Sequence, residues 1–299
     1  MSNEALIVAA VRTPIGKAPR GSLRHTRPDD LAAFAIRALL ARCASVDPAE
    51  IEDVIFGCAT PEGEQGLNIA RVAALRAGLP LSTPGATVNR FCASGLEAVA
   101  IAAERIRSGD AEVVLAGGVE SMSRVPFLDI HTHPNPTLFQ TMPNTFLSMG
   151  LSVEQLARKH GITREQADAF ALHSHQKAIR AQDEGLFDAE IAPVQTEIQG
   201  TDEQGRPTCE KITLTQDEGP RRDTSLETLA KLKPAFRPDG LITAGNASQR
   251  SDGAAAVLLM SERKANTLGL KPLLRMVGYT TAALTPEDFG VAPAYAIPK

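Results

Sequence analysis

The fold is decided by residues 87–118, TVNRFCASGLEAVAIAAERIRSGDAEVVLAGG. The stretch opens with the end of a strand, Thr87–Asn89, and continues into residues of helical spacing, Ser94–Arg107, that stop at Ser108-Gly109. A short apolar run, Glu112–Ala116 (EVVLA), follows, and we expect Gly117-Gly118 to close it. The stretch therefore predicts a strand, a helix and a second strand in succession.

The same alternation of strands and helices is predicted toward the N-terminus. Two apolar strands, Ala5–Val11 (ALIVAAV) and Val54–Cys58, alternate with two helical segments, Asp29–Arg42 and Asn68–Ala77. Ala5–Val11 is apolar throughout, which indicates a strand buried on both faces. Alternating strands and helices are typical of parallel sheets with crossover helices. The sequence thus predicts an α/β fold with a mostly parallel sheet covered by helices.

The character of the chain changes after Ser121. Residues 125–150 carry four prolines and no clean periodicity, so they are expected to be a long loop. Two amphipathic helices are expected at Val153–Lys159 and Arg164–Glu184, the second with a capping box of Thr163 and Gln166. Residues 200–220 are polar and rich in turn formers, and apolar strands return at 254–260 and 273–279. We therefore expect an α/β core (1–120), an inserted loop domain (121–241) and a return to the core (242–270).

The amino-acid composition excludes several classes of function. With a formal charge of −4, a pI near 5.9 and no Trp, the chain is not expected to bind nucleic acid or a membrane surface. No apolar run reaches the roughly 18–20 residues that span a bilayer, and no secretory signal is visible at the start. The four cysteines are scattered without a CxxC, which favours reduced thiols and a cytoplasmic location.

Cys92 is the candidate nucleophile, because it lies between a strand and the helix that follows it. Such a junction lies at the C-terminal edge of the sheet, where open α/β sheets bind ligands. A helix N-terminus offers unpaired N–H groups and a positive dipole end, which favour a thiolate and later an oxyanion. Ser94 and Gly95 are small enough to admit a substrate. The alternative is a buried structural cysteine, and efficient attack would also need a general base, usually His.

Several separate motifs resemble the thiolase family, and they occur in the family's order. They are AAVRTPIGK (Ala9–Lys17), NRFCASGLEAV (Asn89–Val99), GGVESMSRVP (Gly117–Pro126), LAKLKPAF (Leu229–Phe236) and TAGNASQRSDGAAA (Thr243–Ala256). Thiolases cleave 3-oxoacyl-CoA or make it by Claisen condensation. The Asn-Arg-Phe before Cys92 is more similar to the degradative 3-ketoacyl-CoA thiolases. The resemblance therefore implies an acyl-CoA C-acyltransferase of fatty acid β-oxidation.

The resemblance also implies residue roles. Cys92 matches the acylated nucleophile, whose own N–H contributes to the oxyanion hole. Arg221 matches a basic residue near the CoA nucleotide, where a guanidinium suits the phosphates. Met149 matches an acyl-pocket residue, although Ser148 stands where the family often has His. The remaining matches line the tunnel for the pantetheine arm of CoA: Phe236, Ala244 and Ser248.

The resemblance implies coenzyme A and acyl-CoA as substrates, no permanently bound cofactor, and a homodimer or homotetramer. His131 and His133 lie in the long loop, and His173 and His175 lie in a helix. A spacing of two residues on a helix does not place two ligands on one face, so no metal is expected. A nucleotide-binding α/β domain is disfavoured, because no G-x-G-x-x-G follows a strand.

Three segments of the family's second half are not found in these 299 residues: an Asn-Glu-Ala-Phe loop, a Gly-His-Pro segment with the activating His, and a Cys-x-Gly-Gly-Gly turn. Residues 271–299 are therefore expected to begin an incomplete C-terminal thiolase half, and the chain alone is expected to turn over very slowly. Two alternatives stay open. One is an acetoacetyl-CoA-forming acetyl-CoA C-acetyltransferase, and the other is a non-catalytic CoA-binding module or subunit of a split enzyme.

Overall fold

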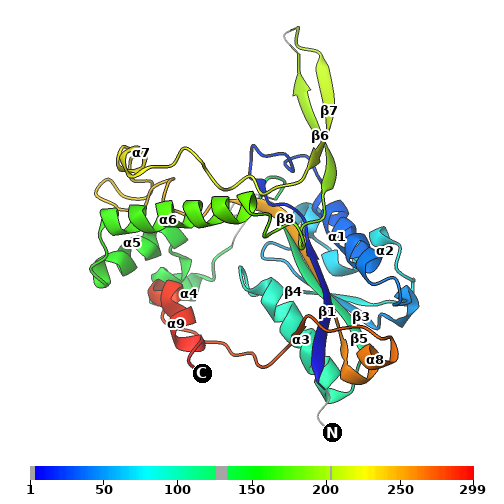
Figure 1. Cartoon of the computed structure of the whole chain (residues 1–299). Coiled ribbons are helices and arrows are strands. Elements are labelled where there is room, and N and C mark those ends of the chain that lie inside the picture. Colours follow the sequence, from blue (N-terminus) through cyan, green and yellow to red (C-terminus); the bar gives the residue numbers. More distant parts are fainter. Residues whose placement is uncertain (1–3, 126–132, 203) are drawn as a thin grey trace. The chain divides into compact units, whose positions relative to one another are not determined.

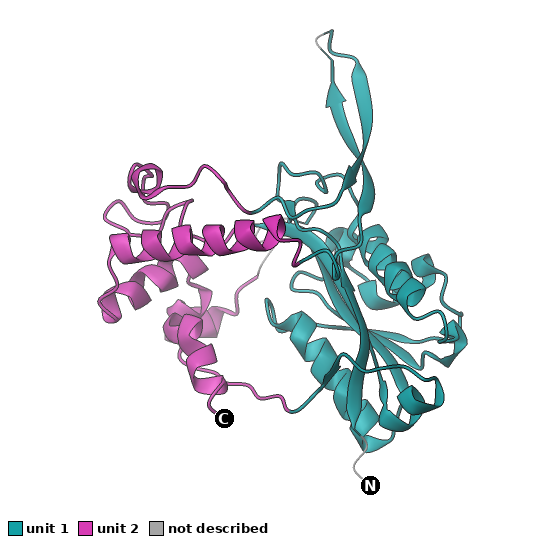
Figure 2. Cartoon of the chain, viewed as in Figure 1, with its two compact units in different colours: residues 1–129, 187–219, 250–277 teal, residues 130–186, 220–249, 278–299 magenta. Residues whose placement is uncertain are grey.

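The computed structural model describes residues 4–125, 133–202 and 204–299. The chain forms two compact units, which Figure 2 shows in different colours. Unit 1 comprises residues 1–129, 187–219 and 250–277, and unit 2 comprises residues 130–186, 220–249 and 278–299. The division into core, loop domain and C-terminal half that the sequence suggests stays a prediction.

Unit 1 is built on a seven-stranded sheet, in which six strands follow the order β4-β3-β5-β8-β1-β9 and the seventh, β2, pairs with β8 (Figure 1). The strands are β1 (Ala5–Arg12), β2 (Gly16–Lys17), β3 (Asp53–Gly57), β4 (Gly85–Val88), β5 (Val113–Ser121), β8 (Ser251–Ser261) and β9 (Leu274–Arg275). β3 is parallel to β4 and β5, whereas β8 is antiparallel to its neighbours β5, β1 and β2. β1 to β5 consequently all run in one direction, which confirms the mostly parallel sheet. The opposite direction of β8, in the middle of the sheet, was not predicted.

Helices cover both faces of this sheet. α1 (Pro28–Arg42) and α2 (Ile69–Ala77) pack on one face, where alternate residues of the strands, such as Val54 and Phe56, point. α3 (Ser94–Ser108) packs on the other face, against the intervening residues such as Ile55 and Val114. Unit 1 also contains α8 (Glu262–Thr267) and two short 3-10 helices, η1 (Pro48–Glu50) and η2 (Gly63–Gln65). The three predicted helices of the core are thus confirmed.

The bounds of β5 and β9 differ from the expectation in ways that bear on the fold. β5 does not close at Gly117-Gly118 but continues to Ser121, pairing with β8 along its whole length. A side chain at Gly117 would collide with the carbonyl oxygen of Ala255 on β8, so glycine here permits close strand pairing and does not mark a turn. The predicted strand at 273–279 shrinks to the two residues of β9.

The polar segment 200–220 contains half of a β-hairpin and is not only a run of turns. β6 (Val194–Thr201) and β7 (Pro207–Leu214) pair in antiparallel register from Val194↔Leu214 to Thr201↔Pro207 (Figure 1). Most side chains of β7 are exposed, so its sequence lacks the apolar signal of a buried strand. After the hairpin, Asp217 accepts hydrogen bonds from the Ile15 amide at 2.8 Å and from Arg12 Nη1 at 2.7 Å, which ties the segment to the end of β1.

Unit 2 is helical. Its elements are α4 (Pro136–Thr141), η3 (Pro143–Phe146), α5 (Met149–Lys159), α6 (Arg164–Asp183), α7 (Leu226–Ala230), η4 (Pro286–Val291) and α9 (Ala292–Ala296). The capping box of Thr163 and Gln166 is confirmed. α4 and η3 lie within the predicted long loop, of which residues 126–132 are outside the described residues. None of the helices in the described ranges is long and apolar enough to cross a membrane.

Candidate active site

Cys92 lies in the turn between β4 and α3, two residues before the helix begins. Its thiol is exposed, so the alternative of a buried structural cysteine is wrong for this residue. The preceding residue, Phe91, has a φ of 47°, a left-handed conformation that is uncommon for an aromatic residue. A non-glycine residue held in this region marks a backbone that its surroundings constrain, and such residues cluster at functional sites.

Close packing places the start of α3 on the ends of the parallel strands. A side chain at Gly57, the last residue of β3, would collide with backbone atoms of Ser94 and Gly95. Gly118 on β5 also lies close, because a side chain there would come within 3.5 Å of the Gly95 Cα. The glycines therefore allow the N-terminus of α3 to pack directly on the carboxyl end of β3 and on β5, at the edge of the sheet where the sequence predicts a ligand.

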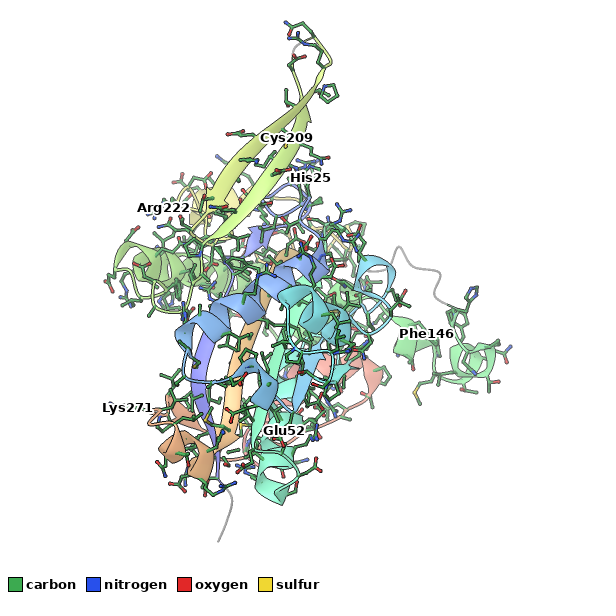
Figure 3. All side chains as sticks on the ribbon, turned by 90° about the vertical axis from the view of Figure 1, so that its right-hand side faces the viewer. His25, Glu52, Phe146, Cys209, Arg222 and Lys271 are labelled. Carbon is green, nitrogen blue, oxygen red and sulfur yellow. The ribbon has the colours of Figure 1, made fainter. Side chains whose placement is uncertain are left out.

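The other three cysteines differ from Cys92 in burial or partner. Cys43 and Cys58 are buried, and burial raises the pKa of both thiols. For Cys58 burial and the nearby Glu120 carboxylate raise the pKa to about 12. Cys209, on the hairpin (Figure 3), is exposed, but its hydrogen bond to Glu197 at 3.4 Å raises its pKa.

These environments predict the order of thiol modification. Because the thiolate is the reactive form, iodoacetamide should alkylate Cys92 in the folded chain and leave Cys43 and Cys58 intact. The Cys58 thiol should stay protonated, and hence unmodified, as the pH rises from about 7 to about 10. Cys209 should react more slowly than an ordinary exposed thiol at neutral pH, since its raised pKa lowers the thiolate fraction. Peptide mapping of alkylated protein checks this, and early labelling of Cys58 would contradict the packing.

The other candidate residues all belong to unit 2. The structure places Phe236 close to the start of α5: Gly150, the residue after Met149, packs so tightly on the Phe236 ring that a side chain there would collide with it. Both side chains are partly exposed, at 48% for Met149 and 44% for Phe236. Ser148, the departure from the family pattern, serves as the N-cap of α5.

Ala244 and Ser248 lie in an exposed loop whose shape is held from within unit 2. Asn246 accepts a hydrogen bond from the Thr243 amide and donates to the Leu241 carbonyl and to Asp168 of α6, at 2.8, 2.9 and 2.8 Å. Gly245 packs against two leucines, with no room for a side chain. The loop thus presents Ala244 and Ser248 outward on a rigid support.

Two buried carboxylates of unit 2 were missed by sequence reasoning. Glu154 of α5 is 1% exposed and accepts hydrogen bonds from the amides of Leu241 (3.0 Å) and Ile242 (2.9 Å). Asp168 of α6 is 4% exposed and pairs with Arg164 at 2.8 Å. The only signal in the sequence is a charged residue on an otherwise apolar helix face, which does not reveal its distant partner.

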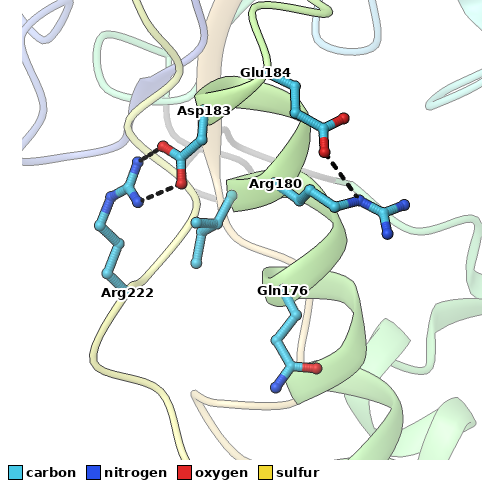
Figure 4. Close-up of a pocket in the computed structure, with 6 residues that line it drawn as sticks. Gln176, Arg180, Asp183, Glu184 and Arg222 are labelled. Carbon is cyan, nitrogen blue, oxygen red and sulfur yellow. Dashed lines mark hydrogen bonds and ion pairs between the residues drawn. The ribbon is translucent and has the colours of Figure 1, made fainter.

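The two adjacent arginines of unit 2 differ in their surroundings. Arg222 forms a bidentate ion pair with Asp183, at 2.5 and 3.0 Å, beside a shallow pocket on α6 (Figure 4). The Arg221 guanidinium is exposed and makes no ion pair with any residue that the structure describes, while its backbone amide donates to Nδ1 of His175 at 3.2 Å. Burial and the Arg221 charge lower the pKa of His175. Arg221 is therefore the arginine with a charge available for a ligand.

No group of three or more His, Cys, Asp or Glu side chains that could hold a metal ion occurs among the described residues. His131 lies outside them. Several carboxylates of unit 1 instead pair with arginines, such as Glu64 with Arg124.

Known proteins share this architecture. A family model described as "Thiolase, N-terminal domain" matches residues 5–263. The 3-ketoacyl-CoA thiolase of Bacillus subtilis is 47% identical over 296 residues, which cover 99% of this chain and 75% of that protein. The 3-ketoacyl-CoA thiolase of Saccharophagus degradans is 45% identical over 297 residues, covering 99% of this chain and 74% of the relative. A crystal structure of the Bacillus anthracis acetyl-CoA acetyltransferase superposes with a TM-score of 0.85 at 39% identity, covering 99% of this chain and 75% of the other.

The fold and the site thus define the chain as an α/β protein with an exposed cysteine at the N-terminus of a helix. The match over most of its length, and relatives above 40% identity, show that the chain belongs to the thiolase family. It spans about three quarters of the length of these relatives.

Proposed function

We propose that the chain is an acyl-CoA C-acyltransferase that cleaves 3-oxoacyl-CoA through an acyl-enzyme on Cys92. The observation that carries the proposal is the exposed Cys92 thiol in the constrained turn before α3, in a chain whose relatives include 3-ketoacyl-CoA thiolases. An exposed thiol at a helix N-terminus has access to substrate and lies where negative charge is stabilised by about 0.3–1 kcal/mol.

The chemistry divides into two acyl transfers. The Cys92 sulfur attacks the C3 carbonyl, the C2–C3 bond breaks, and the electron pair left on C2 takes a proton to give acetyl-CoA. The thiol of a second CoA then attacks the Cys92 thioester, which releases the shortened acyl-CoA and returns the Cys92 thiol. The α3 N-terminus, together with the Cys92 amide, would stabilise the oxyanion in both transfers.

Unit 2 supplies the proposed contacts to coenzyme A. The exposed side chains of Met149 and Phe236 would contact the acyl chain and the pantetheine arm, and the loop carrying Ala244 and Ser248 would present small side chains along the same arm. The Arg221 guanidinium would pair with a CoA phosphate. CoA is a substrate here and not a resident cofactor. A homodimer or homotetramer and a cytoplasmic location stay predictions.

Replacing Arg221 by alanine should weaken CoA binding about 10-fold, because one charge-assisted contact to phosphate is worth about 1.5–3 kcal/mol when well formed and less when exposed. Arg222→Ala is the matched control, since the Arg222 charge is already neutralised by Asp183. Titration calorimetry with CoA measures both variants. Equal weakening by the two substitutions would contradict the role of Arg221.

Substrate preference separates the proposal from its alternative. The likeness to an acetyl-CoA acetyltransferase favours acetoacetyl-CoA as a second candidate substrate. Purified chain incubated for hours with 3-oxooctanoyl-CoA should release about one equivalent of acetyl-CoA as Cys92 becomes acylated. Release only from acetoacetyl-CoA would favour the second candidate. CoA binding without any acetyl-CoA release from either substrate would favour a non-catalytic module.

A further inference from the structure

The turn that carries Cys92 is held by the side chain of Asn89, which bridges two backbone segments. Asn89 Oδ1 accepts a hydrogen bond from the Phe91 amide at 2.7 Å, and Asn89 Nδ2 donates to the Ala59 carbonyl at 3.1 Å. Ala59 is itself anchored, because its amide donates to the Glu120 carboxylate at 2.7 Å. Asn89 thereby connects the turn to the rigid ends of β3 and β5.

Ser94 holds the same turn from the helix side. Its hydroxyl accepts a hydrogen bond from the Arg90 amide at 2.8 Å and donates to the Phe91 carbonyl at 2.5 Å. Ser94 is 3% exposed, so this hydroxyl is shielded from competing water. Both polar groups of the Phe91 backbone are thus bonded by side chains, the amide by Asn89 and the carbonyl by Ser94.

These bonds account for the unusual backbone at Phe91. A φ of 47° for a non-glycine residue is costly and persists only where neighbouring groups enforce it. Phe91 is 63% exposed, so packing of its side chain does not explain the conformation. The enforcing groups are the Asn89 and Ser94 side chains, one on each side of Cys92 in the sequence.

We propose that Asn89 and Ser94 are positioning residues that fix the orientation of the Cys92 thiol and amide for acyl transfer. The inference rests on the proposed function of Cys92. Acyl transfer requires the sulfur and an oxyanion-binding N–H to converge on one carbonyl, and a displacement of about 1 Å can cost about 100-fold in rate. Alkylation by a small reagent needs only an accessible thiolate and has no such geometric requirement.

The test compares two reactions of the same thiol in the full chain. The rate of Cys92 acylation by 3-oxooctanoyl-CoA and the rate of its alkylation by iodoacetamide are measured by mass spectrometry for wild type, Asn89→Ala and Ser94→Ala. We expect acylation to fall about 10- to 100-fold in both variants while alkylation changes less than about 3-fold. Asn89→Asp keeps an acceptor for the Phe91 amide but loses the donor to Ala59, so its acylation rate should be intermediate.

A matched control separates positioning from general loss of stability. Ser261 is a fully buried serine of unit 1 that caps α8, where β8 ends beside the start of β1, at the opposite edge of the sheet. Ser261→Ala should lower stability but leave the ratio of acylation to alkylation unchanged. In a second pair, Phe91→Gly should be more stable than Phe91→Ala yet slower in acylation, because glycine accepts the positive φ and frees the turn.

The outcomes are distinct. An unchanged acylation rate in Asn89→Ala and Ser94→Ala, or an equal fall of acylation and alkylation, overturns the positioning role and leaves the proposed function intact. A wild-type chain that is alkylated at Cys92 but never acylated overturns the proposed function, and the inference with it.

Discussion

Replacement of Cys92 by alanine is expected to abolish acyl-enzyme formation, lowering the rate of acyl transfer from 3-oxoacyl-CoA by about 1,000-fold or more. Cys92 is exposed, whereas Cys43 and Cys58 are buried and Cys209 donates a hydrogen bond to the Glu197 carboxylate, and these environments raise the pKa of the other three thiols. No other thiol should therefore substitute for it. Acyl transfer is measured as radiolabelled or mass-detected adduct per chain over time.

Cys209→Ala is the matched control for this prediction, because it removes the other exposed cysteine, which lies on the hairpin. It should leave acyl-enzyme formation unchanged. Undiminished acylation in Cys92→Ala, or its loss in Cys209→Ala, would reject the assignment of the nucleophile. Circular dichroism of both variants verifies that they are folded, which is expected since neither side chain is part of the core.

Replacement of Glu154 by alanine is expected to lower the free energy of unfolding by about 2–4 kcal/mol. The substitution removes two hydrogen bonds to a buried carboxylate and leaves the amides of Leu241 and Ile242 without acceptors. The segment that begins at Leu241 leads into the loop of Ala244 and Ser248, so CoA binding should weaken as well. Urea denaturation and calorimetric CoA titration measure the two effects.

Two further variants make the Glu154 prediction specific. Glu154→Gln keeps one acceptor oxygen and should lose less stability than the alanine variant. Glu227→Ala removes an exposed glutamate of α7 and should change stability by no more than about 0.5 kcal/mol. If Glu154→Ala were as stable as Glu227→Ala, the buried carboxylate would not support the loop.

The fold was predictable where burial imposes a pattern on the sequence. Ala5–Val11 and Asn68–Ala77 lie in the elements expected of them, because buried strands need apolar runs and helices need an apolar face and an end signal such as Gly78. The direction of β8 was not predictable, because an apolar run indicates that a strand is buried but does not indicate whether the strand runs parallel or antiparallel to its neighbours. The hairpin was missed because β6 alternates buried and exposed residues only at its start and β7 is exposed along most of its length.

In the candidate site too, some residues could be predicted from the sequence and others could not. Cys92 could be predicted as the candidate nucleophile because the residues next to it in the sequence show that it lies between a strand and a helix. Asn89, although three residues away, acts through Ala59, and Glu154 acts through Leu241 and Ile242. Partners so far apart in sequence come together only in the folded chain, and the spacing of nearby residues does not predict them.

The most direct test of the central claim is peptide mapping of the chain after incubation with 3-oxooctanoyl-CoA. Because the acyl group should be carried as a thioester, the adduct should be the mass of the shortened acyl group, should lie on the peptide that contains Cys92, and should be removed by added CoA or hydroxylamine. An adduct found solely on Cys43, Cys58 or Cys209, or no adduct while iodoacetamide still labels Cys92, would contradict the claim.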